Sequence, residues 1–368
     1  MRREAFAGLL PPLVGGGYGA DSACVVLATE SSAVQCNDVR AFYFVGVASS
    51  GVESWATSRT LRLNPCPALA RLQTTQVTKK ETLTIAEVIG RTAEYLRERG
   101  VTTSRLDAEL LIAHALGVTR LDIYLDRERP LTEAELARAR ELVRRRAARE
   151  PVAYITGKKE FFGREFLVTP AVLIPRPETE LLVEHVLEEL DRRFAGELPL
   201  RVLEFGAGSG AISVTLAAEC PRLTAVATEV SPSAAEVARQ NAQRFGVAER
   251  VEVRLQGDFA GIKGPFHAIV SNPPYIAESE EDELPPDVVR YEPHEALFAG
   301  PDGMKWIRWL LANSAPLLVS GGFIAFEIGA GMAQRVRRAA EECGWRVEAI
   351  LRDYAEIERI VRCVLSPT

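Results

Sequence analysis

A strand, a glycine-rich turn and a helix follow one another near the middle of the chain, and this succession limits the fold more than any other segment. Residues 201–205 read as a strand and residues 211–218 as a helix. The turn between them is formed by Gly206, Ala207, Gly208, Ser209 and Gly210. Backbone N–H groups and the positive helix end can there face a polar ligand closely. Ala211 also satisfies a dinucleotide fingerprint, so the turn alone leaves a nicotinamide coenzyme open.

Two further predicted strands end in residues that suit an adenosine ligand. Residues 223–228 lead to Glu229, whose carboxylate can accept from both hydroxyls of a ribose. Residues 251–255 lead to Asp258 and Phe259; the aspartate can accept from an adenine amino group, and the phenyl ring can stack on the base. The plain alternatives are a solvated carboxylate at Glu229 and a core side chain at Phe259.

A fourth strand, residues 266–271, is followed directly by Asn272, Pro273, Pro274 and Tyr275. Proline lacks the N–H that a central strand needs, so two prolines end the strand and leave carbonyl groups without a neighbouring donor. A simple proline turn is the alternative. However, all four motifs fall at the carboxyl ends of strands, where open α/β sheets bind ligands. The sequence therefore predicts an α/β fold with a ligand site along that edge.

With these motifs the chain resembles the S-adenosylmethionine-dependent methyltransferases, and among them the release factor glutamine methyltransferases of the PrmC/HemK type. The resemblance extends from about residue 83 to residue 363. Besides the glycine turn it rests on residues 151–157, 173–180, 271–275, 290–293 and 352–354. The Asn-Pro-Pro-Tyr box is also similar to that of adenine-N6 DNA and guanine-N2 rRNA methyltransferases, whereas segment 173–180 is more specific. Glu204 and Glu229 stand where aspartate is frequent, so the carboxylate is kept.

The resemblance implies a doubly wound, seven-stranded, Rossmann-like sheet with a small N-terminal helical bundle joined to it by a β-hairpin. It implies S-adenosylmethionine as the cofactor. The cofactor-binding residues that it implies are Gly206, Ala207, Gly208, Ser209, Gly210, Glu229, Asp258, Phe259 and Asn272.

The implied substrate is the glutamine of a Gly-Gly-Gln tripeptide in peptide-chain release factors, modified in the cytoplasm. Its binding residues would be Asn272, Pro273, Pro274 and Tyr275, of which Asn272, Pro273 and Tyr275 would be catalytic. An amide nitrogen is a poor nucleophile because its lone pair is delocalised. We expect the Asn272 side-chain oxygen and the Pro273 carbonyl to accept its two N–H bonds and orient it. Tyr275 would pack on the amide and the sulfonium, a cation–π contact of about 0.5–2 kcal/mol.

Two other substrates stay open: a glutamine of a large-subunit ribosomal protein, and the exocyclic amine of a nucleic-acid base. A net charge of −6 over 368 residues argues against direct nucleic-acid binding. No apolar run approaches the length of a membrane span, so no membrane association is expected. The six cysteines include no Cys-x-x-Cys pair and do not cluster with the four histidines, which predicts no metal site.

The chain divides into four predicted parts. Residues 77–150 should form a helical substrate-docking domain, with helices at 84–99, 104–116 and 132–149 and a cap at Thr132. Residues 151–175 read as a hairpin linker, and residues 176–368 as the methyltransferase domain. Residues 1–76 fit neither pattern and are expected to be a disordered extension, or upstream sequence read through a wrongly assigned start with Val77 as the true one.

Two charged segments carry further expectations. An acidic loop at residues 276–303 is long enough to act as a lid. An arginine-rich stretch is read as a solvated helix face, with contact to a protein partner as the alternative. Its members are Arg138, Arg140, Arg144, Arg145, Arg146 and Arg149.

Overall fold

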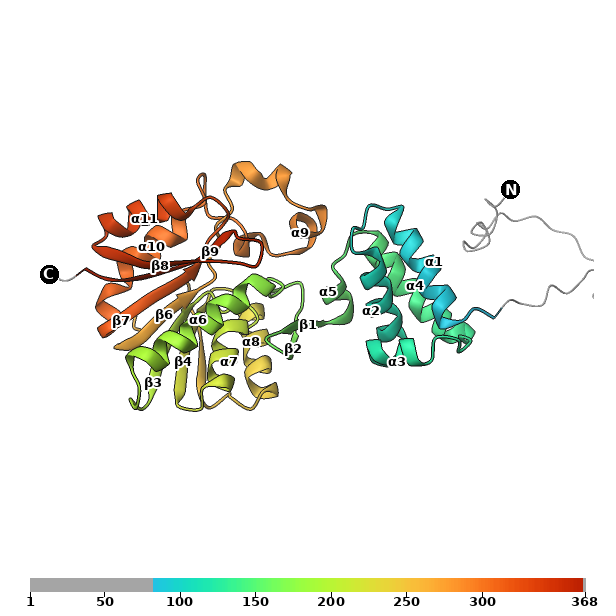
Figure 1. Ribbon diagram of the computed structural model, residues 1–368, viewed down its shortest axis with the longest axis horizontal. Coiled ribbons are helices and arrows are strands. Elements are labelled where there is room, and N and C mark those ends of the chain that lie inside the picture. Colours follow the sequence, from blue (N-terminus) through green and yellow to red (C-terminus); the bar gives the residue numbers. More distant parts are fainter. Residues whose placement is uncertain (1–81, 367–368) are drawn as a thin grey trace, which may run out of the picture. The chain divides into compact units, whose positions relative to one another are not determined.

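The computed structural model describes residues 82–366 (Figure 1). Its main sheet has the strand order β5-β4-β3-β6-β7-β9-β8. The strands are β3 Leu200–Phe205, β4 Leu223–Glu229, β5 Val251–Leu255, β6 Phe266–Ser271, β7 Leu318–Glu327, β8 Trp345–Arg352 and β9 Glu358–Leu365. The first five pair in parallel, whereas β9 runs antiparallel to β7 and β8. The predicted seven-stranded sheet is confirmed; the expectation for residues 1–76 lies outside the described residues.

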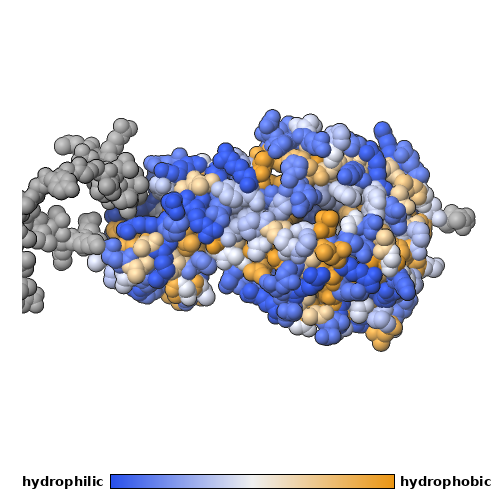
Figure 2. All heavy atoms as spheres, turned by 180° about the vertical axis from the view of Figure 1, so that it is seen from behind, coloured by the Kyte–Doolittle hydropathy of each residue, from blue (hydrophilic) through white to orange (hydrophobic). Residues whose placement is uncertain are grey.

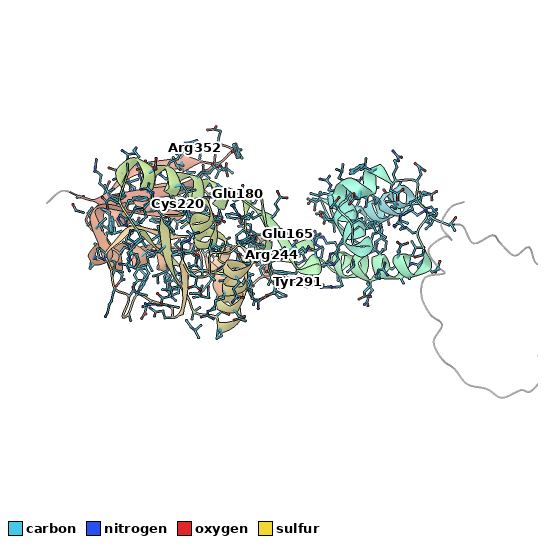
Figure 3. The ribbon with its side chains drawn as sticks, turned by 90° about the horizontal axis from the view of Figure 1, so that it is seen from below. Glu165, Glu180, Cys220, Arg244, Tyr291 and Arg352 are labelled. Carbon is cyan, nitrogen blue, oxygen red and sulfur yellow. The ribbon has the colours of Figure 1, made fainter. Side chains whose placement is uncertain are left out.

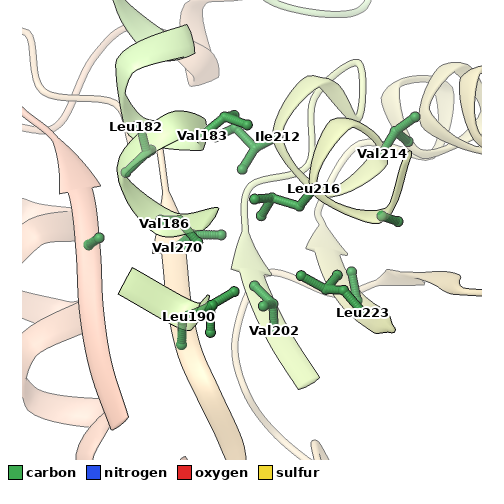
Figure 4. Close-up of a cluster of buried hydrophobic side chains, with 14 of the residues drawn as sticks. Leu182, Val183, Val186, Leu190, Val202, Ile212, Val214, Leu216, Leu223 and Val270 are labelled. Carbon is green, nitrogen blue, oxygen red and sulfur yellow. The ribbon is translucent and has the colours of Figure 1, made fainter. Parts of the chain in front are cut away.

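Helices cover both faces of the sheet. Alternate residues of a strand point to opposite sides, so apolar residues on each side need helices to bury them. Val202 and Val270 belong to a core under α6 and α7 (Figure 4), whereas Leu203 and Ile269 belong to a second core under α10 and α11. Strands that are buried on both faces read as continuous apolar runs, which is why this sheet could be predicted. The helices are α6 Pro177–Arg193, α7 Ala211–Glu219, α8 Pro232–Arg244, α9 Pro286–Tyr291, α10 Lys305–Asn313 and α11 Ala333–Glu342.

The predicted helical bundle precedes the sheet. Its helices are α1 Ile85–Arg97, α2 Ser104–Leu116, α3 Arg120–Leu125 and α4 Glu133–Ala147. The predicted cap is confirmed, because the Thr132 hydroxyl accepts from the Glu135 N–H while the Glu135 carboxylate accepts from the Thr132 N–H. Helix α3 was not predicted, since six residues are too few to display a helical period.

The arginine-rich stretch is not uniformly solvated, which corrects that expectation. Arg146 is only 5% exposed, and its Nε donates a 2.6 Å hydrogen bond to Asp107 in α2. Arg149 pairs with Asp287, 138 positions away, at 3.1 Å. The expectation failed at these two positions because their partners are brought to them only by folding. It holds for Arg140, which is exposed.

The linker at residues 151–175 begins with a helical turn, not with a strand. Helix α5 covers Val152–Thr156 and ends at Gly157, whose φ of 73° makes it a left-handed C-cap. The predicted hairpin follows as β1 Lys158–Phe161 and β2 Arg164–Leu167, with Gly163 in its turn. It lies against α8, where Figure 3 shows Glu165 beside Arg244, paired at 2.8 Å. Helix α5 was not predicted within this linker, because a five-residue helix leaves no clear period.

Figure 2 shows hydrophilic residues over most of one face, with apolar residues in small separate areas between them. Between residues 82 and 366, no helix is both long enough and apolar enough to cross a membrane.

Candidate active site

The order of the sheet reverses beside β3, whose neighbours are β4 on one side and β6 on the other. The carboxyl ends of strands at such a reversal form a crevice. Phe205 and Ser271 are register partners at the ends of β3 and β6, so the glycine turn and the Asn-Pro-Pro-Tyr box start side by side. A cavity of about 360 Å³ lies here. Of the predicted site residues its wall includes Gly206, Ala207, Gly208, Ser209, Glu229, Asn272 and Pro274.

The glycine turn has a backbone shape that other residues rarely adopt. Gly206, Gly208 and Gly210 have φ values of 76°, 54° and 78°. A Cβ on Gly206 or Gly208 would meet no other group within 4 Å, whereas one on Gly210 would lie 3.1 Å from a methyl carbon of Val214 and 3.3 Å from Ala238. Gly210 thus permits close packing of α7 on α8, whereas Gly206 and Gly208 are favoured by their positive φ alone.

Glu229 ties the end of β4 to the glycine turn. One carboxylate oxygen accepts from the Gly208 N–H at 2.8 Å, and the other accepts from the Ser231 N–H at 2.9 Å. Each oxygen retains a lone pair for a ligand. On the other side of the turn, Asn241 of α8 donates to the Ser209 carbonyl at 2.8 Å. Asn241 also bonds both backbone groups of Leu167 in β2, so one buried amide fixes turn, helix and hairpin together. The role of Asn241 was not predicted, because its position in the helical repeat of α8 indicates only that its side chain faces the protein interior.

The end of β5 contributes differently from the expectation. The cavity wall includes Gln256 and Gly257 but stops short of Asp258 and Phe259. The Phe259 ring packs on Trp309, with 4.8 Å between ring centroids, which agrees with the core alternative. The Asp258 carboxylate is exposed and accepts from the N–H two residues onward. Contact of either residue with a cofactor stays a prediction.

A buried chain of hydrogen bonds lies behind the Asn-Pro-Pro-Tyr box. Asn272 Nδ2 donates to Thr179 Oγ1 at 3.0 Å, and Thr179 Oγ1 donates to Glu327 Oε2 at 2.6 Å. The Tyr275 hydroxyl donates to the other oxygen of Glu327 at 3.1 Å. Pro273, Tyr275 and Gly210 are not part of the cavity wall. The hydroxyl at the end of the Tyr275 ring is therefore held by Glu327 of β7.

Thr179 and Glu327 were not predicted to belong to the site. Thr179 lies within residues 173–180, but a threonine in the first turn of a helix gives no signal of a functional role. Glu327 did carry a signal, since a lone carboxylate ends the apolar strand pattern of residues 323–326, as Glu229 ends β4. The pKa of Glu327 is raised overall, because burial raises it and the hydrogen bonds from Thr179 and Tyr275 offset this rise only in part. Burial, followed by the nearby Glu327 charge, raises the pKa of Tyr275.

A second carboxylate, Glu204 of β3, lies under the glycine turn. It is 1% exposed, and it accepts from the Ser213 N–H in the first turn of α7 at 3.1 Å. Burial raises its pKa to about 8; the hydrogen bonds from Ser213 oppose this rise, and the charge of Glu229 adds to it. Glu204 and Glu229, near the carboxyl ends of the neighbouring strands β3 and β4, thus both contribute to the cavity wall.

The opposite side of the cavity comes from the predicted loop at residues 276–303. The segment is partly helical, with short 3₁₀ turns at Glu278–Glu283 and His294–Ala296 around α9. Glu292 is buried, accepts from the Ile174 N–H at 3.1 Å and pairs with Arg176 at 2.6 Å. Pro293 and Glu295 line the cavity next to it. The segment thus covers the site, and its movement as a lid stays a prediction.

Within residues 82–366 no group of three or more histidine, cysteine or acidic side chains is placed to hold a metal ion. His267 is buried in β6, where its Nδ1 accepts from the Arg201 N–H at 2.9 Å. It therefore helps to hold β6 against β3.

Two family models match this chain. The PrmC N-terminal domain matches residues 87–157, and the methyltransferase small domain matches residues 177–290. The release factor glutamine methyltransferase of Moorella thermoacetica is 42% identical over 280 residues, which cover 75% of this chain and 97% of that protein. The release factor glutamine methyltransferase of Chlorobaculum tepidum is 40% identical over 287 residues, or 76% of this chain and 97% of that protein. The protein with the same name in Geobacter sulfurreducens is 40% identical over 285 residues, or 77% and 97%.

Proposed function

This chain belongs to the family of release factor glutamine methyltransferases, and from that premise we propose that it methylates the side-chain amide nitrogen of the glutamine in the Gly-Gly-Gln motif of peptide-chain release factors. The methyl donor is S-adenosylmethionine, and the reaction takes place in the cytoplasm, where release factors act. The observation that carries the proposal is that the glycine turn, Glu229 and Asn272 line one cavity. A cofactor and a planar amide can therefore meet in it.

The charge of the cavity wall suits a cationic cofactor. Glu229 and Glu295 line it, whereas its one arginine, Arg176, is neutralised by Glu292. S-Adenosylmethionine carries positive charge on its sulfonium and amino groups, and its ribose hydroxyls can donate to the free lone pairs of Glu229. A nicotinamide coenzyme would instead bring a pyrophosphate beside these carboxylates. The sequence had left this alternative open, and the charge of the wall disfavours it.

When bound, the cofactor supplies an electrophilic methyl group on sulfur. The Asn272 side-chain oxygen and the Pro273 carbonyl accept the two N–H bonds of the glutamine and aim its nitrogen at that carbon. Transfer of that methyl group to the nitrogen would leave the cofactor as a neutral thioether, and one amide proton would pass to solvent. The two oxygens stabilise the positive charge that develops on nitrogen, so the site works by position and charge and needs no strong base.

A transfer assay with labelled methyl groups tests the proposal. Release factor, its variant with alanine in place of the motif glutamine, the large-subunit ribosomal protein and DNA are offered side by side. Label should appear on unmodified release factor alone. Label on the alanine variant, on the ribosomal protein or on DNA in its place would refute the assignment.

A further inference from the structure

Thr179 and Glu327 form a buried hydrogen-bonded link that ends at the Asn272 amide. We infer that they are positioning residues, which fix this amide with its oxygen free for the substrate and thereby make the site select an amide over a carboxylate. The inference rests on the proposed function. It concerns two residues that lie on α6 and β7, outside the Asn-Pro-Pro-Tyr box itself.

The direction of each hydrogen bond follows from the count of donors. Thr179 has a single hydroxyl proton, and it donates that proton to Glu327 Oε2, 2.6 Å away. The Thr179 oxygen is then left with lone pairs and must accept from its other neighbour. That neighbour is Asn272 Nδ2 at 3.0 Å, since the side-chain oxygen of Asn272 has no proton to offer. The chain of bonds therefore leaves Asn272 Oδ1 as the free end of the amide.

The fold makes this link rigid. Ser271 and Phe326 are register partners on the parallel strands β6 and β7, so Asn272 and Glu327 follow at the same level on neighbouring strands. Thr179 and Glu327 are 4% and 1% exposed, so water has little access to replace either partner. The second oxygen of Glu327 accepts from Tyr275 at 3.1 Å.

Other charged groups also act on Glu327. Arg359, on β9, stabilises its ionised form, and Glu178, next to Thr179 on α6, opposes ionisation. Arg359 is itself held at 3.0 Å by Asp353. Arg359 thus lowers the pKa of Glu327 and partly offsets the effect of burial, which raises it.

The orientation of Asn272 has a direct consequence for the choice of substrate. A glutamine side chain offers two N–H donors to two acceptors, Asn272 Oδ1 and the Pro273 carbonyl. A glutamate carboxylate at the same position offers only acceptors. Its oxygens would face the two acceptor oxygens of the site with no proton between them. If the Asn272 amide turned over, its NH₂ group would face the substrate, so glutamine would lose an acceptor and glutamate would gain a donor.

Variants at Thr179 separate the hydroxyl from the shape of the side chain. Thr179→Val removes the hydroxyl and keeps the branched shape; Thr179→Ser keeps the hydroxyl and is the matched control. Thr179→Ala removes the hydroxyl with a smaller side chain and replaces the valine variant if that one does not fold. For each protein, we would measure kcat and KM with release factor, and the affinities for S-adenosylmethionine, for release factor and for its form with glutamate as the motif residue.

The hydroxyl-free variants should lose kcat by about tenfold or more and should lower the preference for glutamine over glutamate by about fivefold, with cofactor affinity within about twofold. Thr179→Ser should keep both the rate and the preference near wild type. A merely structural role for Thr179 would not change the preference. An unchanged preference in both hydroxyl-free variants, or an equal loss in Thr179→Ser, would overturn the inference. Failure of the wild-type protein to methylate release factor would overturn the proposed function instead.

Discussion

The N–H of Gly208 donates a 2.8 Å hydrogen bond to the carboxylate of Glu229, so the end of β4 holds the glycine turn that follows β3. The two residues are 21 positions apart, and each looked like a separate cofactor contact in the sequence. In the structure they act as one unit, because a carboxylate that is fixed by two backbone donors can present its remaining lone pairs in a set direction.

Glu229→Gln should weaken cofactor binding by about tenfold or more, because the new NH₂ group must face either the Gly208 or the Ser231 N–H, and an unsatisfied buried donor costs about 1–3 kcal/mol. Calorimetric titration with S-adenosylmethionine measures the change. Glu249→Gln removes an equal charge from an exposed position and is the control. Equal affinities of the two variants would count against the role of Glu229.

Asn272→Ala should reduce kcat by about 100-fold or more while leaving cofactor affinity largely intact, because it removes an acceptor that acts on the reacting nitrogen. Single-turnover methylation of release factor and cofactor titration measure the two effects separately. Asn313→Ala, an exposed amide at the end of α10, serves as the control. Near-normal turnover in Asn272→Ala would refute the proposed mechanism.

Glu204 should make the stability of the cofactor-free protein decrease as the pH rises from the usual carboxyl pKa of 4.5 to about 8. Its pKa of about 8 in the folded protein lies above its usual 4.5, so the folded state holds the proton more tightly than the unfolded state does. The resulting stability is complete below the usual value and is lost as the pH rises through about 8. Glu204→Gln imitates the protonated form and should retain a higher Tm than wild type at about pH 9 but not at about pH 5. Parallel pH profiles of the two proteins would contradict this assignment.

Arg146→Ala should destabilise the helical bundle by about 3–5 kcal/mol, because it leaves the Asp107 carboxylate buried without its partner. Arg140→Ala, on the exposed side of the same helix, should change the free energy of unfolding by less than about 0.5 kcal/mol. Urea unfolding followed by circular dichroism compares them. Similar midpoints for the two variants would show that the buried pair has no special weight.

The sheet and the location of the site were predictable because their signals are local. Strands that are buried on both faces leave apolar runs, and each motif directly follows its own strand. Where the signal was short, prediction failed: five residues of α5 and six of α3 are too few to display a period. The expectation that the arginine-rich stretch of α4 is solvated failed for another reason. A charge pattern does not say which arginine has a buried partner.

The sequence by itself determined the α/β sheet, the motifs at its strand ends and the type of chemistry that those motifs serve. Only the tertiary structure decided how the side chains in the site are oriented. Thr179 and Glu327 are 148 positions apart, and Asn272 lies 93 positions from Thr179. The Phe259 ring likewise packs on Trp309, 50 positions later in the chain. The physical reason is that an amide or an aromatic ring has its direction set by the partners that folding brings to it, whereas strands and turns are encoded by neighbours in the chain.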